Sequence, residues 1–238
     1  MNTIEVSNEY WATCAMILTT IQKETLIGNI LGDGYIERRK NTYNPTLTIE
    51  QTYPKRADYV NHLYEIYANL VLQREPKIVV RKPDVRTGKV YSSIRFSTRS
   101  LPCLIPIYEI FYTENRKRRL PNNIGELITA RSLAYWIIDD GHRTFGMQTV
   151  LNTNAFSYNE IVILQKALMD NFELRTRLWE KRPNQYIIFI PVIQKVPLRD
   201  IVGKYILPSI LYKIKELFYF YSFLLIYRSN TYVRMHRN

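Results

Sequence analysis

The sequence predicts an α+β protein in which one unit of helices and antiparallel strands occurs twice around a pseudo-two-fold axis. Two nine-residue segments, Leu26–Gly34 (LIGNILGDG) and Leu133–Gly141 (LAYWIIDDG), are apolar through most of their length, and both end in Asp-Gly. Their acids, Asp33 and Asp140, are separated by a little under half of the chain. The runs after each segment have strand and helix periodicities in the same order, which indicates an αββαββ-type unit in each half.

Strand and helix periodicities define the first half after Gly34. Leu47 and Ile49 alternate with polar residues, which is the period of a half-buried strand. Residues 56–72 have apolar side chains at helical spacing, namely Tyr59, Leu63, Ile66, Tyr67 and Leu70. The predicted elements are, in order, short strands at 35–41 and 47–51, a helix at 56–72, strands at Lys77–Arg81 and Val90–Ser97, and a helix at Leu104–Tyr112.

The same order recurs in outline after Gly141. Ser157 followed by Glu160 three residues later is a capping box, which predicts where a helix begins. The other predicted elements are strands at Thr149–Thr153, Leu174–Lys181 and Gln185–Ile190 and a helical segment at 198–205. The chain divides accordingly into an N-terminal half at 1–115, a basic, turn-rich linker at 116–131, a C-terminal half at 132–215 and a helical extension at 216–238.

Charge is the most informative bulk property of the chain. Lys and Arg number 33 against 21 Asp and Glu, which leaves a net charge of +12 and a pI near 9.6. A protein this basic usually binds nucleic acid or an anionic membrane. The strongest apolar run, Leu217–Tyr227, is about half as long as the roughly 20 residues that a membrane-spanning helix needs, so no membrane span is expected. Two cysteines and three scattered histidines imply neither a disulfide framework nor a Cys/His metal site.

Two copies of an apolar helix ending in Asp-Gly, each opening the same unit, resemble the motifs of single-chain LAGLIDADG homing endonucleases. The segments PNNIGEL, SLAYWIIDDG, TVLNTNAFSYNE and YILPSILYKI are similar to the omega-intron type within that family, and the resemblance covers roughly residues 20–215. It implies αββαββα units that form a DNA-binding saddle of two antiparallel sheets. It also implies a monomer that makes a site-specific, metal-dependent double-strand break with short 3′ overhangs in a long, asymmetric DNA duplex.

Other functions remain open at this point. An RNA maturase that assists group I intron splicing with the same fold is the alternative, since both activities need a basic surface. A membrane-surface protein that uses the C-terminal aromatic run is a weaker one. A composition rich in Tyr, Asn, Ile and Lys and poor in Gly is typical of an AT-rich coding sequence. Together with the family, it indicates a mitochondrion or another organelle as the location.

The resemblance assigns the catalytic metal ions to Asp33 and Asp140, with the backbone carbonyls of Gly32 and Asp139 as further ligands. A carboxylate at a helix C-terminus faces the negative end of the macrodipole, and two of them together repel each other. Such an arrangement raises at least one pKa unless cations bind. Oxygen ligands suit Mg²⁺, for which Ca²⁺ or Mn²⁺ can substitute. Two solvent-exposed acids at helix ends are the alternative interpretation.

Further catalytic residues follow from the resemblance alone. Gln51 and its second-half counterpart Asn154 are expected to position the attacking water. Lys213 matches the basic residue that family members place near one scissile phosphate. In the first half that residue is Lys117 or Arg118, although a solvated linker is an equally good interpretation of the basic run at 116–119.

The second motif departs from the first at two positions. Gly28 and Gly32 are four residues apart on one helical face, which allows close approach of a neighbouring backbone. The corresponding residues of the second motif are Tyr135 and Asp139. The second helix is therefore expected to pack off-centre, and the two DNA strands are expected to be cut at unequal rates.

Period-2 alternation predicts which side chains face the major groove. The inward residues of the first sheet are expected to be Ile36, Leu47, Ile49, Ile78, Val80, Ile94 and Phe96. The outward, DNA-binding residues are then Glu37, Arg39, Thr48, Glu50, Lys77, Arg81, Ser93 and Arg95 in the first half and Arg175, Arg177, Trp179 and Lys181 in the second. In the second half, on the predicted strand Leu174–Lys181, the inward positions are Leu174, Thr176 and Leu178.

Overall fold

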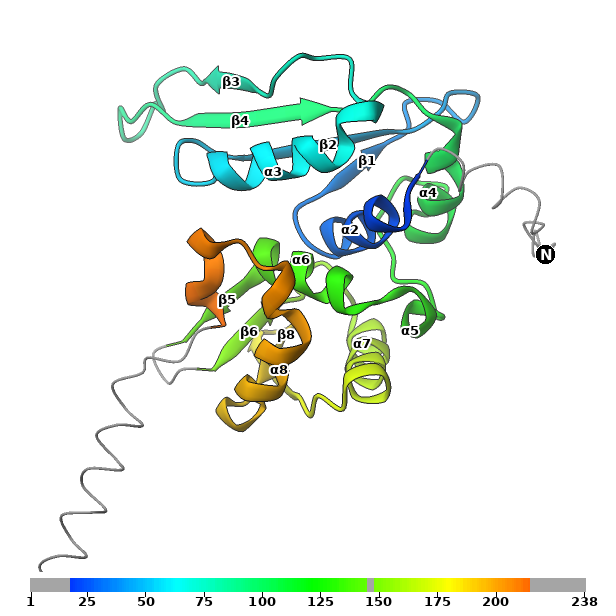
Figure 1. Cartoon of the computed structure of the whole chain (residues 1–238), viewed down its shortest axis with the longest axis vertical. Coiled ribbons are helices and arrows are strands. Elements are labelled where there is room, and N and C mark those ends of the chain that lie inside the picture. Colours follow the sequence, from blue (N-terminus) through cyan, green and yellow to red (C-terminus); the bar gives the residue numbers. More distant parts are fainter. Residues whose placement is uncertain (1–17, 145–147, 215–238) are drawn as a thin grey trace, which may run out of the picture.

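The computed structural model describes residues 18–144 and 148–214, which form two similar halves, one above the other in Figure 1. Each half has one four-stranded antiparallel sheet covered on one face by helices. The strand order is β1-β2-β4-β3 in the first half and β5-β6-β8-β7 in the second, so both sheets have the same topology. The predicted α+β fold with pseudo-two-fold symmetry is therefore confirmed.

The first half begins with the helix that contains the first Asp-Gly segment. Its elements are α2 (Thr20–Leu31), β1 (Tyr35–Glu37), β2 (Thr46–Thr52), α3 (Ala57–Tyr67), β3 (Lys77–Val80), β4 (Ser92–Ser97) and α4 (Ile105–Phe111). Helix α2 starts after Thr19, because the Thr19 hydroxyl accepts from the Gln22 amide at 3.2 Å and the Gln22 side chain accepts from the Thr19 amide at 3.0 Å. Gly32 caps the C-terminal end of the helix, and its backbone N–H donates to the Gly28 and Asn29 carbonyls.

The second half repeats this order with α6 at its centre. Its elements are α6 (Ala130–Asp140), β5 (Gly141–Arg143), β6 (Thr149–Asn152), α7 (Tyr158–Phe172), β7 (Arg177–Arg182), β8 (Gln185–Ile190) and α8 (Lys195–Val202). The predicted capping box at the start of α7 is confirmed: the Ser157 amide and hydroxyl both donate to the Glu160 carboxylate at 2.7 Å. The chain then continues through short 3-10 helices at Gly203–Tyr205 and Pro208–Lys213.

The stretch between the halves is structured rather than a free linker. It contains the short helix α5 (Ile124–Leu127), which packs against α7, and the start of α6. Arg118 pairs with Tyr112 in an isolated antiparallel β-bridge. The basic run at 116–119 is therefore held in a fixed position against the first half.

The core is continuous through both halves, and α2 and α6 pack against each other at its centre. Five of the seven predicted inward residues of the first sheet are buried, but Ile78 and Val80 are 51% and 65% exposed. That part of the prediction was wrong, because β3 is the edge strand and α3 packs on β2 and β4 instead. Alternation gives the face of a strand, but burial also requires a covering element.

Within the described residues, no helix is both long and apolar enough to cross a membrane. The apolar run Leu217–Tyr227 and the predicted extension at 216–238 lie outside the described residues.

Candidate functional site

The C-terminal ends of α2 and α6 bring the two predicted acids together. Asp33 follows α2 and is exposed, whereas Asp140 is the last residue of α6 and is half-buried. Burial, followed by the charge of Asp33, raises the pKa of Asp140 to about 7. Two carboxylates that are neighbours at two helix ends are a site that favours bound protons or cations.

Asp139, predicted as a metal ligand through its backbone carbonyl, also adds a third carboxyl group, whose presence at the site was not predicted. Its side chain is 9% exposed and lies against Gly32, where an added Cβ would be 2.4 Å from the Asp139 Cβ. Asn29 donates to Asp139 Oδ2 at 3.2 Å, while Oδ1 has no hydrogen-bond partner among the described residues. Burial, and then the charge of Asp33, raises the pKa of Asp139 to about 7. The signal in the sequence was an acid at the position where the first motif has glycine.

Arg118 is the basic residue that contacts the first motif. Its Nη1 donates to the Gly32 carbonyl at 2.8 Å, and its Nη2 donates to the Gly34 carbonyl at 2.7 Å. Lys117, the other predicted candidate, is exposed, and its charge helps to lower the pKa of Glu160. Of the two, Arg118 is therefore the residue positioned beside Asp33.

Lys213 occupies the corresponding place at the second motif. Its buried Nζ donates to the carbonyls of Ile137 and Asp139, at 3.1 and 3.3 Å, and to the Ile138 carbonyl between them. Burial, and then the nearby Arg56, lowers the pKa of Lys213 to about 8. Each motif thus ends at a basic side chain that donates hydrogen bonds to its terminal carbonyls. A positive charge is favourable at a helix C-terminus, where the macrodipole is negative.

Arg56 is a further basic residue at this site, and sequence reasoning missed it. It precedes α3 in the first half, yet its Nη2 donates across to the Ile138 carbonyl of α6 at 3.2 Å. Its buried Nη1 has no hydrogen-bond partner among the described residues. The run Lys55-Arg56 after β2 was the only available signal, and spacing does not choose between its two members.

Two side-chain amides contact the acids, one from each sheet. Gln51, near the end of β2, donates through Nε2 to Asp33 Oδ2 at 2.9 Å, so the predicted residue lies at the site. In the second half, Asn152 donates through Nδ2 to the Asp140 carbonyl at 2.9 Å. Asn154, the predicted counterpart of Gln51, is exposed in the turn after β6.

The outer faces of the two sheets carry the predicted DNA-binding residues. The core pair Ile49–Phe96 alternates with the pair Glu50–Arg95, which therefore faces away from the helices. Glu50 accepts from Ser93 Oγ at 2.5 Å and lies 3.1 Å from Arg81 Nη2, and these contacts lower the pKa of Glu50. The remaining predicted residues of this face are Glu37, Thr48 and Lys77 on strands and Arg39, exposed after β1.

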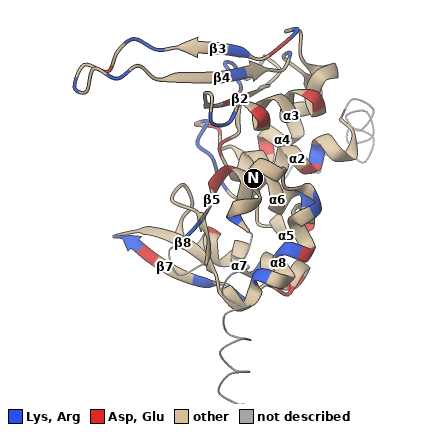
Figure 2. Cartoon of the chain, turned by 60° about the vertical axis from the view of Figure 1, so that its left-hand side comes forward, with Lys and Arg blue, Asp and Glu red and all other residues tan. Residues whose placement is uncertain are grey.

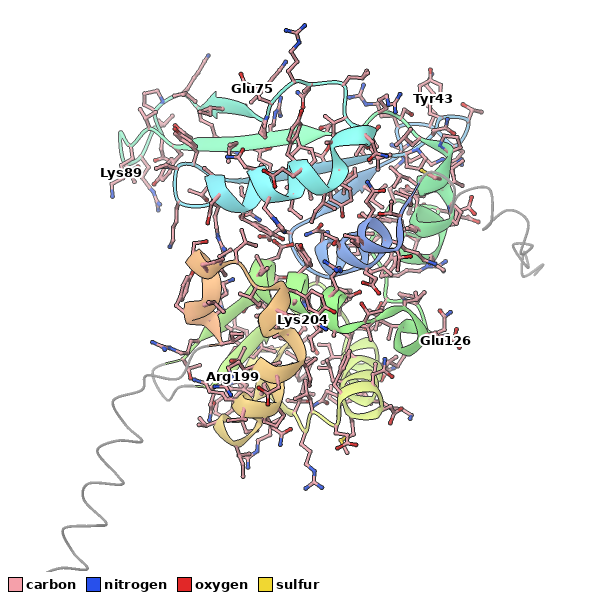
Figure 3. All side chains as sticks on the ribbon, in the orientation of Figure 1. Tyr43, Glu75, Lys89, Glu126, Arg199 and Lys204 are labelled. Carbon is pink, nitrogen blue, oxygen red and sulfur yellow. The ribbon has the colours of Figure 1, made fainter. Side chains whose placement is uncertain are left out.

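On the second sheet, the predicted alternation holds from Leu174 to Trp179, and the register of β7 then shifts between Glu180 and Arg182, where Lys181 lies. Leu174 is buried, and Leu178 packs on the core. The outward residues Arg175, Arg177, Trp179 and Lys181 are all exposed. Figure 2 shows basic residues on β7 and along the β3–β4 hairpin, and Lys89 is labelled on that hairpin in Figure 3.

Comparison with known proteins decides the family. The sequence model of the LAGLIDADG DNA endonuclease family matches residues 23–195, which include both Asp-Gly segments. The chain belongs to this family. Because one chain carries both LAGLIDADG motifs, at Leu26–Gly34 and Leu133–Gly141, it is a single-chain member.

Relatives and a solved structure are similar over most of this LAGLIDADG chain. The probable intron-encoded endonuclease 1 of Wickerhamomyces canadensis is 31% identical over 210 residues, which cover 86% of each protein. The cytochrome b mRNA maturase bI2 of Saccharomyces cerevisiae is 26% identical over 196 residues, or 79% of this chain but only 46% of the maturase. The structure of the homing endonuclease I-WcaI bound to its DNA recognition sequence aligns with a TM-score of 0.77 and 29% identity, covering 90% of this chain and 96% of that one.

Proposed function

We propose that the chain is a site-specific homing endonuclease that acts as a monomer and makes a metal-dependent double-strand break in a long, asymmetric DNA duplex. The observation that carries the proposal is the meeting of Asp33 and Asp140 at two helix ends, with Arg118 and Lys213 beside them. The relatives named as an intron-encoded endonuclease and as a DNA-bound homing endonuclease support it. Two unlike halves in one chain fit a target with two unlike half-sites.

The donor set of the site fits a hard divalent cation. Among the described residues there is no group of three His, Cys, Asp or Glu side chains that would hold a metal by themselves. The ligands would be the Asp33 and Asp140 carboxylates and the Gly32 and Asp139 carbonyls, with phosphate oxygens from the DNA completing the shell. Mg²⁺ is the proposed ion, with Ca²⁺ or Mn²⁺ as substitutes, and it would activate water and neutralise charge at the phosphate.

The surrounding side chains would orient and stabilise the reacting groups. Gln51, already hydrogen-bonded to Asp33, would hold the attacking water in the first half, and Asn152 is better placed than Asn154 to do so in the second. Arg118 and Lys213 would stabilise the negative charge that develops at the two scissile phosphates. Lys117, exposed and next to Arg118 in the chain, would neutralise a phosphate further along the backbone.

The outer sheet faces would bind the major groove of DNA. Outward arginines and lysines suit guanine and phosphate, and the net charge of +12 favours a polyanion. The residues proposed to contact DNA are Glu37, Arg39, Thr48, Glu50, Lys77, Arg81, Ser93, Arg95, Arg175, Arg177, Trp179 and Lys181.

Asparagine substitutions at the two acids test this proposal. Asp33→Asn and Asp140→Asn keep the side-chain shape, so each variant is expected to bind the DNA junction that lacks the intron but not to cut both strands. Asp170→Asn is the matched control, because Asp170 is exposed on α7 and ion-paired with Lys166. Plasmid linearisation and a gel-shift titration on the same duplex are the measurements. Double-strand cleavage by either active-site variant contradicts the proposal.

A maturase activity is the second candidate, because two of the relatives are named cytochrome b mRNA maturases. These names also support a mitochondrion or another organelle as the place of action. Splicing of the host intron by Asp33→Asn protein separates the two functions. Restored splicing by Asp33→Asn protein, which does not cut DNA, supports a maturase. Cleavage of DNA by the wild-type protein, with no effect of either protein on splicing, supports the endonuclease alone.

A further inference from the structure

We infer that the two sheets read different base chemistry, and that an apolar patch on the second sheet recognises thymine methyl groups in the major groove. The patch consists of Trp179, Phe189 and Ile187. The inference rests on the proposed function, because it assigns the patch to the DNA that the saddle would bind. It goes further by naming the bases that one half-site must contain.

Equivalent rows of the two sheets differ in chemistry. In the first sheet, the row across β3, β4 and β2 is Lys77, Arg95 and Glu50, as the register shows. In the second sheet, the equivalent row across β7, β8 and β6 is Trp179, Ile187 and Asn152. The motif acids show that the two rows are equivalent. Tyr35 and His142 lie two residues after Asp33 and Asp140, and they pair with Thr48 on β2 and Val150 on β6. Glu50 and Asn152, which belong to the two rows, lie two residues further along β2 and β6.

The neighbouring row differs in the same direction. Thr48 and Ser97 are paired in the first sheet, and their side-chain oxygens lie 3.0 Å apart. Val150 and Phe189 occupy the equivalent positions in the second sheet. Polar hydrogen-bonding groups on one outer face are therefore replaced by apolar side chains on the other.

The patch is separate from the core of the protein. Leu151 and Ile188, on the alternate positions of the same strands, belong to the main core cluster, whereas none of the three patch residues is part of that cluster. Ile187 is 6% exposed and forms the floor of the patch, whereas Val150 is fully buried and presents no surface to a partner. Trp179 is 62% exposed, and its ring centroid is 6.1 Å from that of Phe189. This arrangement leaves a large aromatic surface in water unless a partner covers it.

Charge around the patch selects the partner. The exposed Arg175, Arg177, Lys181 and Arg182 surround Trp179 along the strand, so a second copy of this basic face would be repelled. DNA supplies phosphates for these cations and an apolar group for the patch. In the major groove, thymine alone among the four bases presents a methyl group, and apolar side chains contact it. The first sheet, where Glu50 holds Arg81, suits guanine instead.

Replacement of thymine by deoxyuridine tests the inference, because it removes one methyl group and leaves every hydrogen-bonding group in place. A duplex is first selected from a random library with the full chain in EDTA, so that binding is measured without cleavage. Each thymine of the half-site under the second sheet is then replaced singly. We expect about fourfold weaker binding at each contacted position, which corresponds to about 0.8 kcal/mol per buried CH₂.

Trp179→Ala, with Arg177→Gln as its matched control, connects the effect to the patch. Both residues are exposed on β7, so neither change is expected to unfold the protein. Trp179→Ala should bind the thymine and deoxyuridine duplexes equally. Arg177→Gln should weaken both equally, lower the salt dependence and keep the fourfold ratio. If a duplex is selected but deoxyuridine has no effect, or Trp179→Ala keeps the ratio, the inference is wrong and the proposed function stands. If no duplex is selected, both fail.

Discussion

Helices α2 and α6 meet in the middle of the molecule, but they contribute opposite kinds of residue to the contact. Helix α2 presents Gly28, where an added Cβ would lie 2.4 Å from the Ser132 carbonyl oxygen and 2.7 Å from the Tyr135 Cβ. It also presents Gly32, which faces Asp139. The second motif was expected to pack off-centre because it lacks these glycines. In the structure, its larger side chains fill the space that the first motif leaves, so each close contact needs one small residue rather than one on each helix.

The same difference extends to the charges at the helix ends. At the end of α2, Arg118 reaches the carbonyls from the segment between the halves. At the end of α6, a buried Lys213 binds three carbonyls, and Arg56 from the other half binds one of them. The second end also carries two acids with raised pKa values, Asp139 and Asp140. The two sites thus contain similar groups in different surroundings, and different rates at the two DNA strands are expected.

Removal of Arg118 or Lys213 is expected to give the largest effect. Loss of one group that stabilises developing charge typically slows a reaction about 10²–10³-fold. Arg118→Gln should slow cleavage mainly of one strand, and Lys213→Gln mainly of the other, so that nicked DNA accumulates. Strand-specific end labels on the target duplex measure the two rates. Lys117→Gln is the control and should change both rates little. Equal slowing of both strands by either variant would show that the two ends act as one site.

The raised pKa values of Asp139 and Asp140 predict how stability depends on pH without divalent ions. In the folded protein these carboxyls keep their protons up to about pH 7, whereas in the unfolded chain they lose them near 3.8. The unfolded state then binds fewer protons, so stability falls as pH rises from about 4 to about 7 and changes little from this cause above that. Asp140→Asn removes one of the two groups and should be more stable than the wild type at pH 7.5.

Urea unfolding in EDTA at several pH values measures this difference. The advantage of Asp140→Asn should shrink as pH falls from about 7 to about 4 and disappear below the unfolded pKa of 3.8, where the carboxyl is protonated in both states. Asp170→Asn, on the exposed face of α7, should show no such pH-dependent gain. A wild-type protein whose stability rises between pH 4 and 7 as much as that of Asp140→Asn would contradict the raised pKa values.

Much of this comparison was accessible from the sequence, because the repeat fixes which residues correspond. The Asp-Gly endings located Asp33 and Asp140, and alternation gave the outer face of β7. Side-chain contacts between distant segments were not accessible. Arg56 acts on the opposite half, and the acidic side chain of Asp139 is explained only by Gly32, which lies on another helix. Such contacts depend on how the helices pack, and they produce no regular spacing of residues in the sequence.

Register and coverage explain the other differences. Asn154 was matched to Gln51 because both follow a predicted strand. In the structure β6 ends at Asn152, and the side-chain amide of Asn152 is the one that contacts the second motif. Ile78 and Val80 were placed in the core by alternation alone, although they lie on the edge strand β3 and α3 packs on β2 and β4 instead. A strand pattern identifies a face, whereas the neighbours of that face are a property of the whole fold.

Alanine substitutions at the two glycines of α2 sharpen the comparison at the level of packing. Gly28→Ala would place Cβ against the Ser132 backbone, and Gly32→Ala would place it against the Asp139 side chain. Both should lower the free energy of unfolding by about 1–3 kcal/mol, as overpacking of a core does. Gly125→Ala on α5 is the control, since its added Cβ would be 3.8 Å from the Ala167 Cβ, an ordinary contact.

Only one of these two losses should be repaired from the other helix. Asp139→Gly removes the atoms that Gly32→Ala would strike, so the double variant should be more stable than the sum of the single changes predicts. No side-chain change at Ser132 removes a backbone oxygen, so the loss from Gly28→Ala should persist in Gly28→Ala/Ser132→Ala. Double-mutant cycles by denaturant unfolding measure both couplings. Full additivity at Gly32 and Asp139 would mean that the acid does not fill the space above the glycine.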